Sequence, residues 1–223
     1  MKLYTEWTLR YSKDKKEYSE EFKATVPGGC QLDYAKYKGL PDYRFSNNTL
    51  LYRGLEDYYW KYATVIPVTN KNLFFYSKGI DYEFEIYIDG EKCFYQEGMF
   101  SEVKIEIPTE KHGKVLEVVI FPAPKRKDAE KGTRREADRC YKPPVCYGWD
   151  FHPRLIVQGI WDEAYIESVD KLHIANVSVD YEVTKLNGES GNVNIRFSVE
   201  KTGGVACFNL YNDKDEFVAV SDT

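Results

Sequence analysis

This chain of 223 residues lacks the features of three broad classes of protein. No apolar run approaches the roughly 18 residues of a membrane-spanning helix, so we expect no membrane partner. The chain has 31 Lys and Arg against 36 Asp and Glu, and its net charge of −5 lacks the basic excess of a nucleic-acid binder. The first residues, 1–7, enter strand-like sequence at once, so we expect no secretory leader and a cytoplasmic location.

Cysteine is scarce, with five residues in a chain long enough to build its own core. Their spacing matches no disulfide framework, which favours reduced thiols. Cys140, Cys146 and His152 follow each other at intervals of six residues, and Zn²⁺ accepts such ligands. No second Cys pair of the usual zinc pattern is present, so the sequence predicts no metal and no cofactor, with this trio as the alternative.

Aromatic residues and alternating patterns are abundant, and both are typical of strands. Aromatics make up 16% of the chain, with 19 Tyr. Apolar and polar residues alternate over 82–89, and Asp89-Gly90 is a two-residue hairpin signal. The stretch 115–121 is apolar on both faces, as in a central strand. We therefore predict an all-β fold, with a short helical turn over 32–40.

The pattern restarts near residues 168–171, which divides the chain. Alternation over 177–183 and 193–199 is typical of an immunoglobulin-type sandwich, which needs about 100 residues. We predict one domain over 1–168 and, over 169–223, the N-terminal part of a truncated immunoglobulin-like β-sandwich. The strand edge exposed by truncation leaves oligomerisation open.

The densest chemistry lies in residues 140–161, where prolines and glycines predict a rigid, irregular loop. It follows a charged stretch, 125–139, interpreted as a solvated loop. An aromatic face beside a carboxylate is what a sugar site uses, and Trp149 and Asp150 provide both. The alternative is structural, with Trp149 in the core and Asp150 paired with Arg154.

The same segment carries a family resemblance. Residues 147–154, Tyr-Gly-Trp-Asp-Phe-His-Pro-Arg, and Gly-Ile-Trp at 159–161 resemble the Gly-Trp-Asp-Trp-Gly-Pro-Arg … Gly-Ile-Trp signature of family 2 glycoside hydrolases, especially their β-mannosidase-like branch. Weaker pieces follow in the family's order, at 26–28, 57–62, 79–90, 98–100 and 116–122. Together they cover roughly residues 3–168.

The resemblance implies a galactose-binding-like jelly-roll sandwich followed by the immunoglobulin-like domain. In the family a barrel of the same polypeptide supplies both catalytic carboxylates of a retaining mechanism, so we expect no catalytic residue in this chain. The expected partners are that catalytic barrel and a terminal β-linked sugar of an oligosaccharide.

By the same resemblance, the substrate-binding residues are Trp149, Asp150 and Arg154. Asp150 would accept sugar hydroxyls in the −1 subsite, with Trp149 and Arg154 shaping or supporting it. Phe151 and His152 stand where the mannosidase pattern has Trp and Gly, which leaves a β-mannosidase, a β-galactosidase, a β-glucuronidase or another exo-glycosidase open. The alternative function is a stand-alone carbohydrate-binding module without a catalytic partner.

Overall fold

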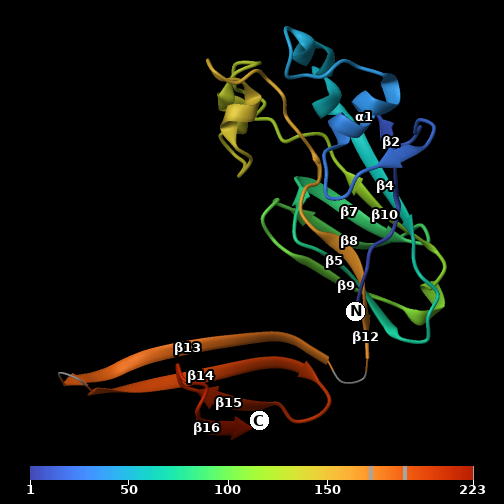
Figure 1. The fold of residues 1–223 in the computed structure, drawn as a ribbon. Helices are drawn as coiled ribbons and strands as arrows, with labels where there is room; N and C mark the ends of the chain where they lie inside the picture. Colours follow the sequence, from blue (N-terminus) through green and yellow to red (C-terminus); the bar gives the residue numbers. More distant parts are fainter. Residues whose placement is uncertain (171–172, 188–189, 223) are drawn as a thin grey trace. The chain divides into compact units, whose positions relative to one another are not determined.

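The computed structural model describes residues 1–170, 173–187 and 190–222 (Figure 1). The chain divides into two compact units, Met1–Ser168 and Val169–Thr223, which are treated separately below. Strands dominate both units, which confirms the all-β expectation. Within the described residues, no helix is long and apolar enough to cross a membrane.

The first unit is built on two antiparallel sheets. The larger has the order β3-β2-β4-β10-β7-β8 and the smaller the order β1-β12-β5-β9, while β11 and β6 form a short separate pair. The strands are β1 (Lys2–Leu3), β2 (Trp7–Ser12), β3 (Phe22–Ala24), β4 (Tyr59–Val65), β5 (Asn72–Ser77), β6 (Ile80–Asp81), β7 (Glu83–Ile88), β8 (Glu91–Glu97), β9 (Val103–Ile107), β10 (Val115–Ile120), β11 (Gly159–Ile160) and β12 (Ala164–Val169).

Side chains from both sheets meet in one hydrophobic core. Trp7 on β2 lies with its ring centroid 6.1 Å from that of Phe75 on β5, and both rings are buried. The apolar residues of the alternating stretch are all buried, as predicted, namely Tyr82, Phe84, Ile86 and Ile88. β10 lies between β4 and β7, which confirms the central strand expected over 115–121.

The turn between β7 and β8 is the predicted hairpin. Asp89 and Gly90 have φ of 53° and 78°, and such paired positive values fit the right-handed twist of the flanking strands. The predicted helical turn is helix α1 (Cys30–Lys38), which ends at Gly39 with a φ of 66°. Short 3₁₀ helices complete the unit, at η1 (Asn48–Tyr52), η2 (Leu55–Asp57), η3 (Thr109–Lys111), η4 (Arg134–Ala137) and η5 (Pro144–Tyr147).

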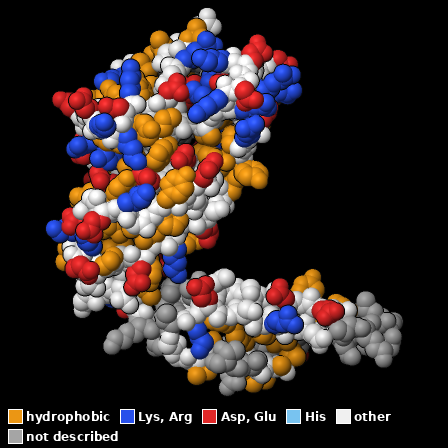
Figure 2. Space-filling view, turned by 180° about the vertical axis from the view of Figure 1, so that it is seen from behind, with side chains coloured by type: hydrophobic (Ala, Val, Ile, Leu, Met, Phe, Trp, Pro, Cys, Tyr) orange, Lys and Arg blue, Asp and Glu red, His pale blue; other side chains and the backbone are white. Residues whose placement is uncertain are grey.

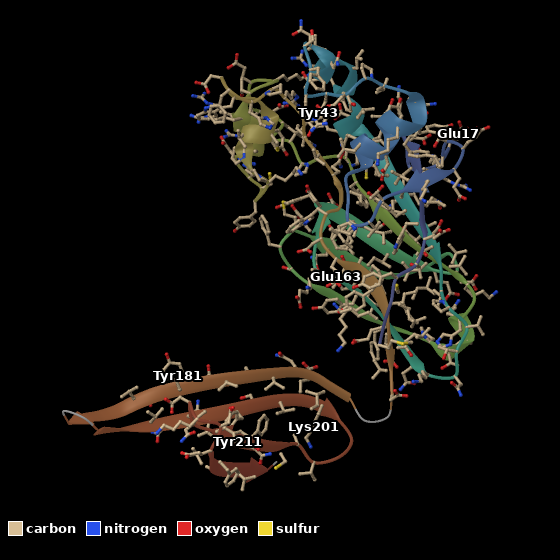
Figure 3. All side chains as sticks on the ribbon, in the orientation of Figure 1. Glu17, Tyr43, Glu163, Tyr181, Lys201 and Tyr211 are labelled. Atoms are coloured by element: carbon tan, nitrogen blue, oxygen red, sulfur yellow. The ribbon has the colours of Figure 1, made fainter. Side chains whose placement is uncertain are left out.

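The N-terminal strand is held by the carboxylate of Glu163, labelled in Figure 3. Lys2 and Lys78 approach it at 2.9 Å and 3.0 Å, and the hydroxyl of Tyr4 also donates to it. Hydrogen bonds from Lys2, Tyr4 and Lys78 lower the pKa of Glu163 from 4.5 to about 2.

Since the folded pKa of Glu163 lies below its unfolded value, its stabilisation is complete above about pH 4.5 and declines toward pH 2. Glu163→Gln should therefore flatten the acid dependence of unfolding free energy in that interval. Urea titrations at pH 5, 4 and 3 measure this. Equal acid slopes for wild type and variant would contradict it. The control is Glu110→Gln, an exposed residue with no ion pair or side-chain hydrogen bond in the described part of the chain.

The second unit consists of two antiparallel pairs, β13 (His173–Asn187) with β14 (Ser190–Thr202), and β15 (Cys207–Tyr211) with β16 (Phe217–Asp222). Phe197 of β14 stacks on Phe208 of β15, with ring centroids 4.5 Å apart. Many of its apolar side chains are exposed, including Val179, Tyr181 and Val193, and hydrophobic atoms reach its surface in Figure 2. Its immunoglobulin-like character stays a prediction.

Candidate functional site

Residues 122–158 form an irregular segment, yellow in Figure 1, at the end of the first unit that also carries α1. The segment has a small hydrophobic core of its own, made by Ala123, Ala137, Tyr147 and Ile156. Tyr147 is fully buried and donates its hydroxyl hydrogen bond to the carbonyl of Pro124 at 2.6 Å. The segment is therefore packed, although it holds no strand.

Arg154 pairs with two buried carboxylates, Glu136 within this segment and Glu56 in the rest of the unit. Its Nη1 lies 2.5 Å from Oε2 of Glu136, and its Nη2 lies 3.1 Å from Oε1 of Glu56. Nη1 also donates to the carbonyl oxygen of Tyr147 at 3.1 Å. The guanidinium is therefore bound by three acceptors, and Arg154 stabilises the loop from inside.

A second buried ion pair lies nearby, between Lys142 and Asp81 of β6. The side chain of Lys142 is only 2% exposed, and its ammonium also donates to the carbonyl of Val157 at 2.6 Å. Burial raises the pKa of Asp81, while the charge and hydrogen bond of Lys142 oppose that rise. The interaction ties the loop to the strand pair β6–β11.

The far end of the segment is hydrogen-bonded to α1. The amide of Gln31 donates to the carbonyl of Ile156 at 3.0 Å, and the backbone N–H of Gln158 donates to Oε1 of Gln31 at 3.0 Å. Both glutamine side chains are buried. The loop is thus held at its base from three directions, which leaves its tip as the exposed part.

Trp149 lies at this tip, directly after a turn that requires glycine. Gly148 has a φ of 125°, and a Cβ there would lie 3.3 Å from the carbonyl oxygen of Gly132. The indole is 39% exposed, so the alternative that Trp149 is a core residue is wrong. One side of the indole is covered by Arg134, whose Cζ lies 3.8 Å from the ring centroid, and Phe151 packs against it edge-on.

These side chains line a cleft of about 610 Å³, called here the arginine–aromatic cleft. Its walls are Arg134, Arg135, Asp138, Pro144, Val145, Trp149 and Phe151. The structure thus brings one of the three predicted site residues, Trp149, into a cleft.

Asp150 is exposed at the same tip but is not among the cleft-lining residues. Its Oδ1 accepts a hydrogen bond from the backbone N–H of Phe151 at 2.9 Å. The alternative of an Asp150–Arg154 ion pair is wrong, because Arg154 is bound by Glu56 and Glu136 instead. Asp150 therefore keeps carboxylate lone pairs directed to solvent.

The hypothetical metal ligands each have local hydrogen bonds. Cys140 and Cys146 donate to the carbonyls of Ala137 and Pro143, and Nδ1 of His152 lies 2.7 Å from the carbonyl oxygen of Pro153. Burial raises the pKa of the Cys146 thiol to about 11, which keeps it protonated near neutral pH. Among the described residues, no three His, Cys, Asp or Glu side chains are grouped to hold a metal ion.

Sequence reasoning missed four residues that build or support the site. The charged stretch 125–139 was interpreted as a solvated loop, which is wrong for Glu136 and Ala137, since both are buried. Arg134 of the same stretch forms a wall of the cleft. Glu56 lies 98 residues from Arg154 in sequence, and no local pattern connects them. The usable signal was the length of the stretch, since long structureless loops in compact domains are commonly functional.

A comparison with protein families matches residues 7–162 to the glycosyl hydrolase 2 galactose-binding domain-like family. The chain belongs to this family. No curated protein matches the chain. The whole segment 122–158 lies within the matched residues, so the arginine–aromatic cleft is part of the family domain.

Two solved structures with a similar fold are a mannosidase and a glucuronidase. A β-D-mannosidase from Dictyoglomus thermophilum is 25% identical, with a TM-score of 0.68, over 100% of this chain and 29% of its own. A β-glucuronidase from Ruminococcus gnavus is 17% identical, with a TM-score of 0.57, over 100% of this chain and 37% of its own. The chain thus spans about a third of the length of these proteins, and its first domain is galactose-binding-like, as expected.

Proposed function

We propose that this chain is the non-catalytic, sugar-binding N-terminal portion of an exo-acting family 2 glycoside hydrolase that removes terminal β-linked sugars. The family match over 7–162, which includes the exposed Trp149–Asp150 tip, is the observation that supports this most. A catalytic barrel of the same polypeptide would complete the pocket, and residues 169–223 would begin the immunoglobulin-like domain between them. Sequencing the coding region beyond Thr223 tests the proposal, and absence of a barrel-encoding sequence would favour a stand-alone binding module.

In this proposal the tip forms one wall of the −1 subsite. Asp150 accepts sugar hydroxyls, which suits a carboxylate whose only hydrogen bond in the described part of the chain is to a neighbouring backbone N–H. Trp149 supplies an aromatic face for sugar C–H groups. Arg154 acts through support, since its ion pairs with Glu56 and Glu136 hold the loop beneath the tip.

Asp150→Asn in the complete enzyme tests this assignment. The amide keeps the shape but loses a charge-assisted acceptor, and kcat/KM should fall about 10- to 150-fold. The melting temperature of the 223-residue chain should change little, because the Asp150 side chain has only one local contact. The control is Asp128→Asn, an exposed carboxylate of the same segment that pairs with Arg126 and does not line the cleft. An unchanged kcat/KM together with a melting temperature several degrees lower would assign Asp150 a structural role.

A further inference from the structure

The arginine–aromatic cleft combines two kinds of wall. Pro144, Val145, Trp149 and Phe151 provide apolar and aromatic surface, and Phe151 is 78% exposed. Arg134 and Arg135, on η4, provide two guanidinium groups. Such a pairing suits a ligand that has both a ring with an apolar face and a negative charge.

Two other arginines in this segment, Arg126 and Arg154, have their charges neutralised by carboxylates. Arg126 is paired with Asp128 and Asp138, at 2.8 Å and 3.2 Å. Arg154 is paired with Glu56 and Glu136. The one carboxylate that lines the cleft, Asp138, is therefore bound to Arg126 and directed to that partner.

Arg134 and Arg135 differ from these two residues. Within the described residues neither guanidinium forms an ion pair or a side-chain hydrogen bond, and both side chains are exposed. Residues 125–139 contain seven Lys or Arg and four Asp or Glu, a surplus of three positive charges in a chain whose net charge is −5. A local positive surplus beside an unpaired arginine pair marks a surface that attracts an anion.

The indole of Trp149 also holds the side chain of Arg134 in place. With Cζ 3.8 Å from the ring centroid, the guanidinium lies against the aromatic face. Stacking restricts the side chain while its N–H groups remain available to an oxyanion, which accepts two of them at once. The cleft is short and the rest of the chain is acidic, so it lacks the extended basic stripe of a nucleic-acid site.

We propose that the arginine–aromatic cleft binds the anionic group of an acidic sugar, a carboxylate or a sulfate, through Arg134 and Arg135, with the sugar ring against Phe151 and the edge of Trp149. This inference rests on the proposed sugar-binding function and narrows its ligand to acidic oligosaccharides. Recognition is by charge, so a neutral sugar of the same shape binds less well.

The test compares three probes on the ¹⁵N-labelled 223-residue chain by NMR. The probes are a β-linked glucuronyl disaccharide, its uncharged methyl ester, and the corresponding 6-sulfated neutral disaccharide. The four Trp indole N–H signals are followed, and the signal lost in Trp149→Phe identifies Trp149. We expect the Trp149 signal to shift, with the free acid binding about three- to tenfold more tightly than the ester, since exposed guanidinium–carboxylate pairs are individually modest. The preference should shrink at 0.5 M salt.

Variants assign the preference to the two arginines. Arg135→Gln leaves the Arg134–Trp149 stack in place and should reduce the preference, and Arg134→Gln with Arg135→Gln should abolish it. The matched control is Arg139→Gln, an exposed arginine of the same stretch that has no ion pair within 4.0 Å among the described residues and does not line this cleft, and it should keep the preference. Unchanged dispersion of the amide signals shows that each variant is folded.

The outcomes separate this inference from the proposed function. Equal binding of acid and ester, or a preference that survives the double variant, overturns charge recognition here while sugar binding stands. Absence of any shift at Trp149 with all three probes also overturns the inference, whereas the proposed function is judged separately by the activity of the complete enzyme. Tight binding of the sulfated probe alone identifies sulfate as the anion, and of the glucuronyl probe alone, carboxylate.

Discussion

Arg154→Met is expected to lower the unfolding free energy of the first unit by about 3–5 kcal/mol, because removing one partner of a buried ion pair leaves uncompensated charge behind. The side chains of Glu56 and Glu136 are each only 7% exposed, so water cannot replace the guanidinium fully. Lys125, 3.6 Å from Glu56, compensates in part and favours the lower end of this range. Chemical denaturation followed by Trp fluorescence measures the effect, since the four tryptophans, at 7, 60, 149 and 161, all lie in the first unit.

Two further variants test whether the loss of stability in Arg154→Met comes from its buried ion pairs. Arg139→Met removes an exposed arginine that forms no ion pair within 4.0 Å in the described part of the chain, and it should cost less than about 0.5 kcal/mol. Adding Glu136→Gln to Arg154→Met should recover part of the loss, since one of the two orphaned charges is then gone. A loss below about 1 kcal/mol for Arg154→Met would mean that the ion pairs form only weakly in solution.

The 223-residue chain alone should hydrolyse no aryl β-glycoside. On the proposed function both catalytic carboxylates belong to the barrel, so the chain lacks the whole chemical acceleration, at least about 10⁶-fold. The measurement is release of nitrophenol from aryl β-mannoside, β-galactoside and β-glucuronide by the purified chain.

The complete enzyme is the positive control for that assay, and buffer is the blank. Because the expected deficit is so large, a turnover well above the blank would require a carboxylate pair within these residues. Such an activity should then survive repeated purification and disappear on heat denaturation. That result would end the assignment of this chain as non-catalytic.

Local patterns predicted the sheet positions well because strand burial follows a two-residue period. Tyr82 to Ile88 alternates, and every apolar member is buried. The hairpin at Asp89-Gly90 followed from backbone preferences of two adjacent residues. In both cases the structure depends on residues that are close together in the sequence, so a single sequence is enough to predict it.

The site was only partly predictable because its supports are distant in sequence. Trp149 was identified from its own surroundings, and its exposure at the loop tip agrees with a binding role, which stays a prediction. The partners of Arg154 come from positions 56 and 136, and those of Gln31 from positions 156 and 158. Neither set of contacts produces a periodic pattern in the sequence, because both depend on the tertiary fold.

The pairing of β1 with β12 affects when the first unit can finish folding during synthesis. Lys2 is opposite Glu167, and the amino group of Met1 donates to the carbonyl of Ser168 at 2.7 Å. Strand β1 therefore remains without its partner until β12, at the other end of the unit, has been synthesised. Such long-range closure slows folding, and the unpaired segment is open to chaperones and proteases throughout that interval.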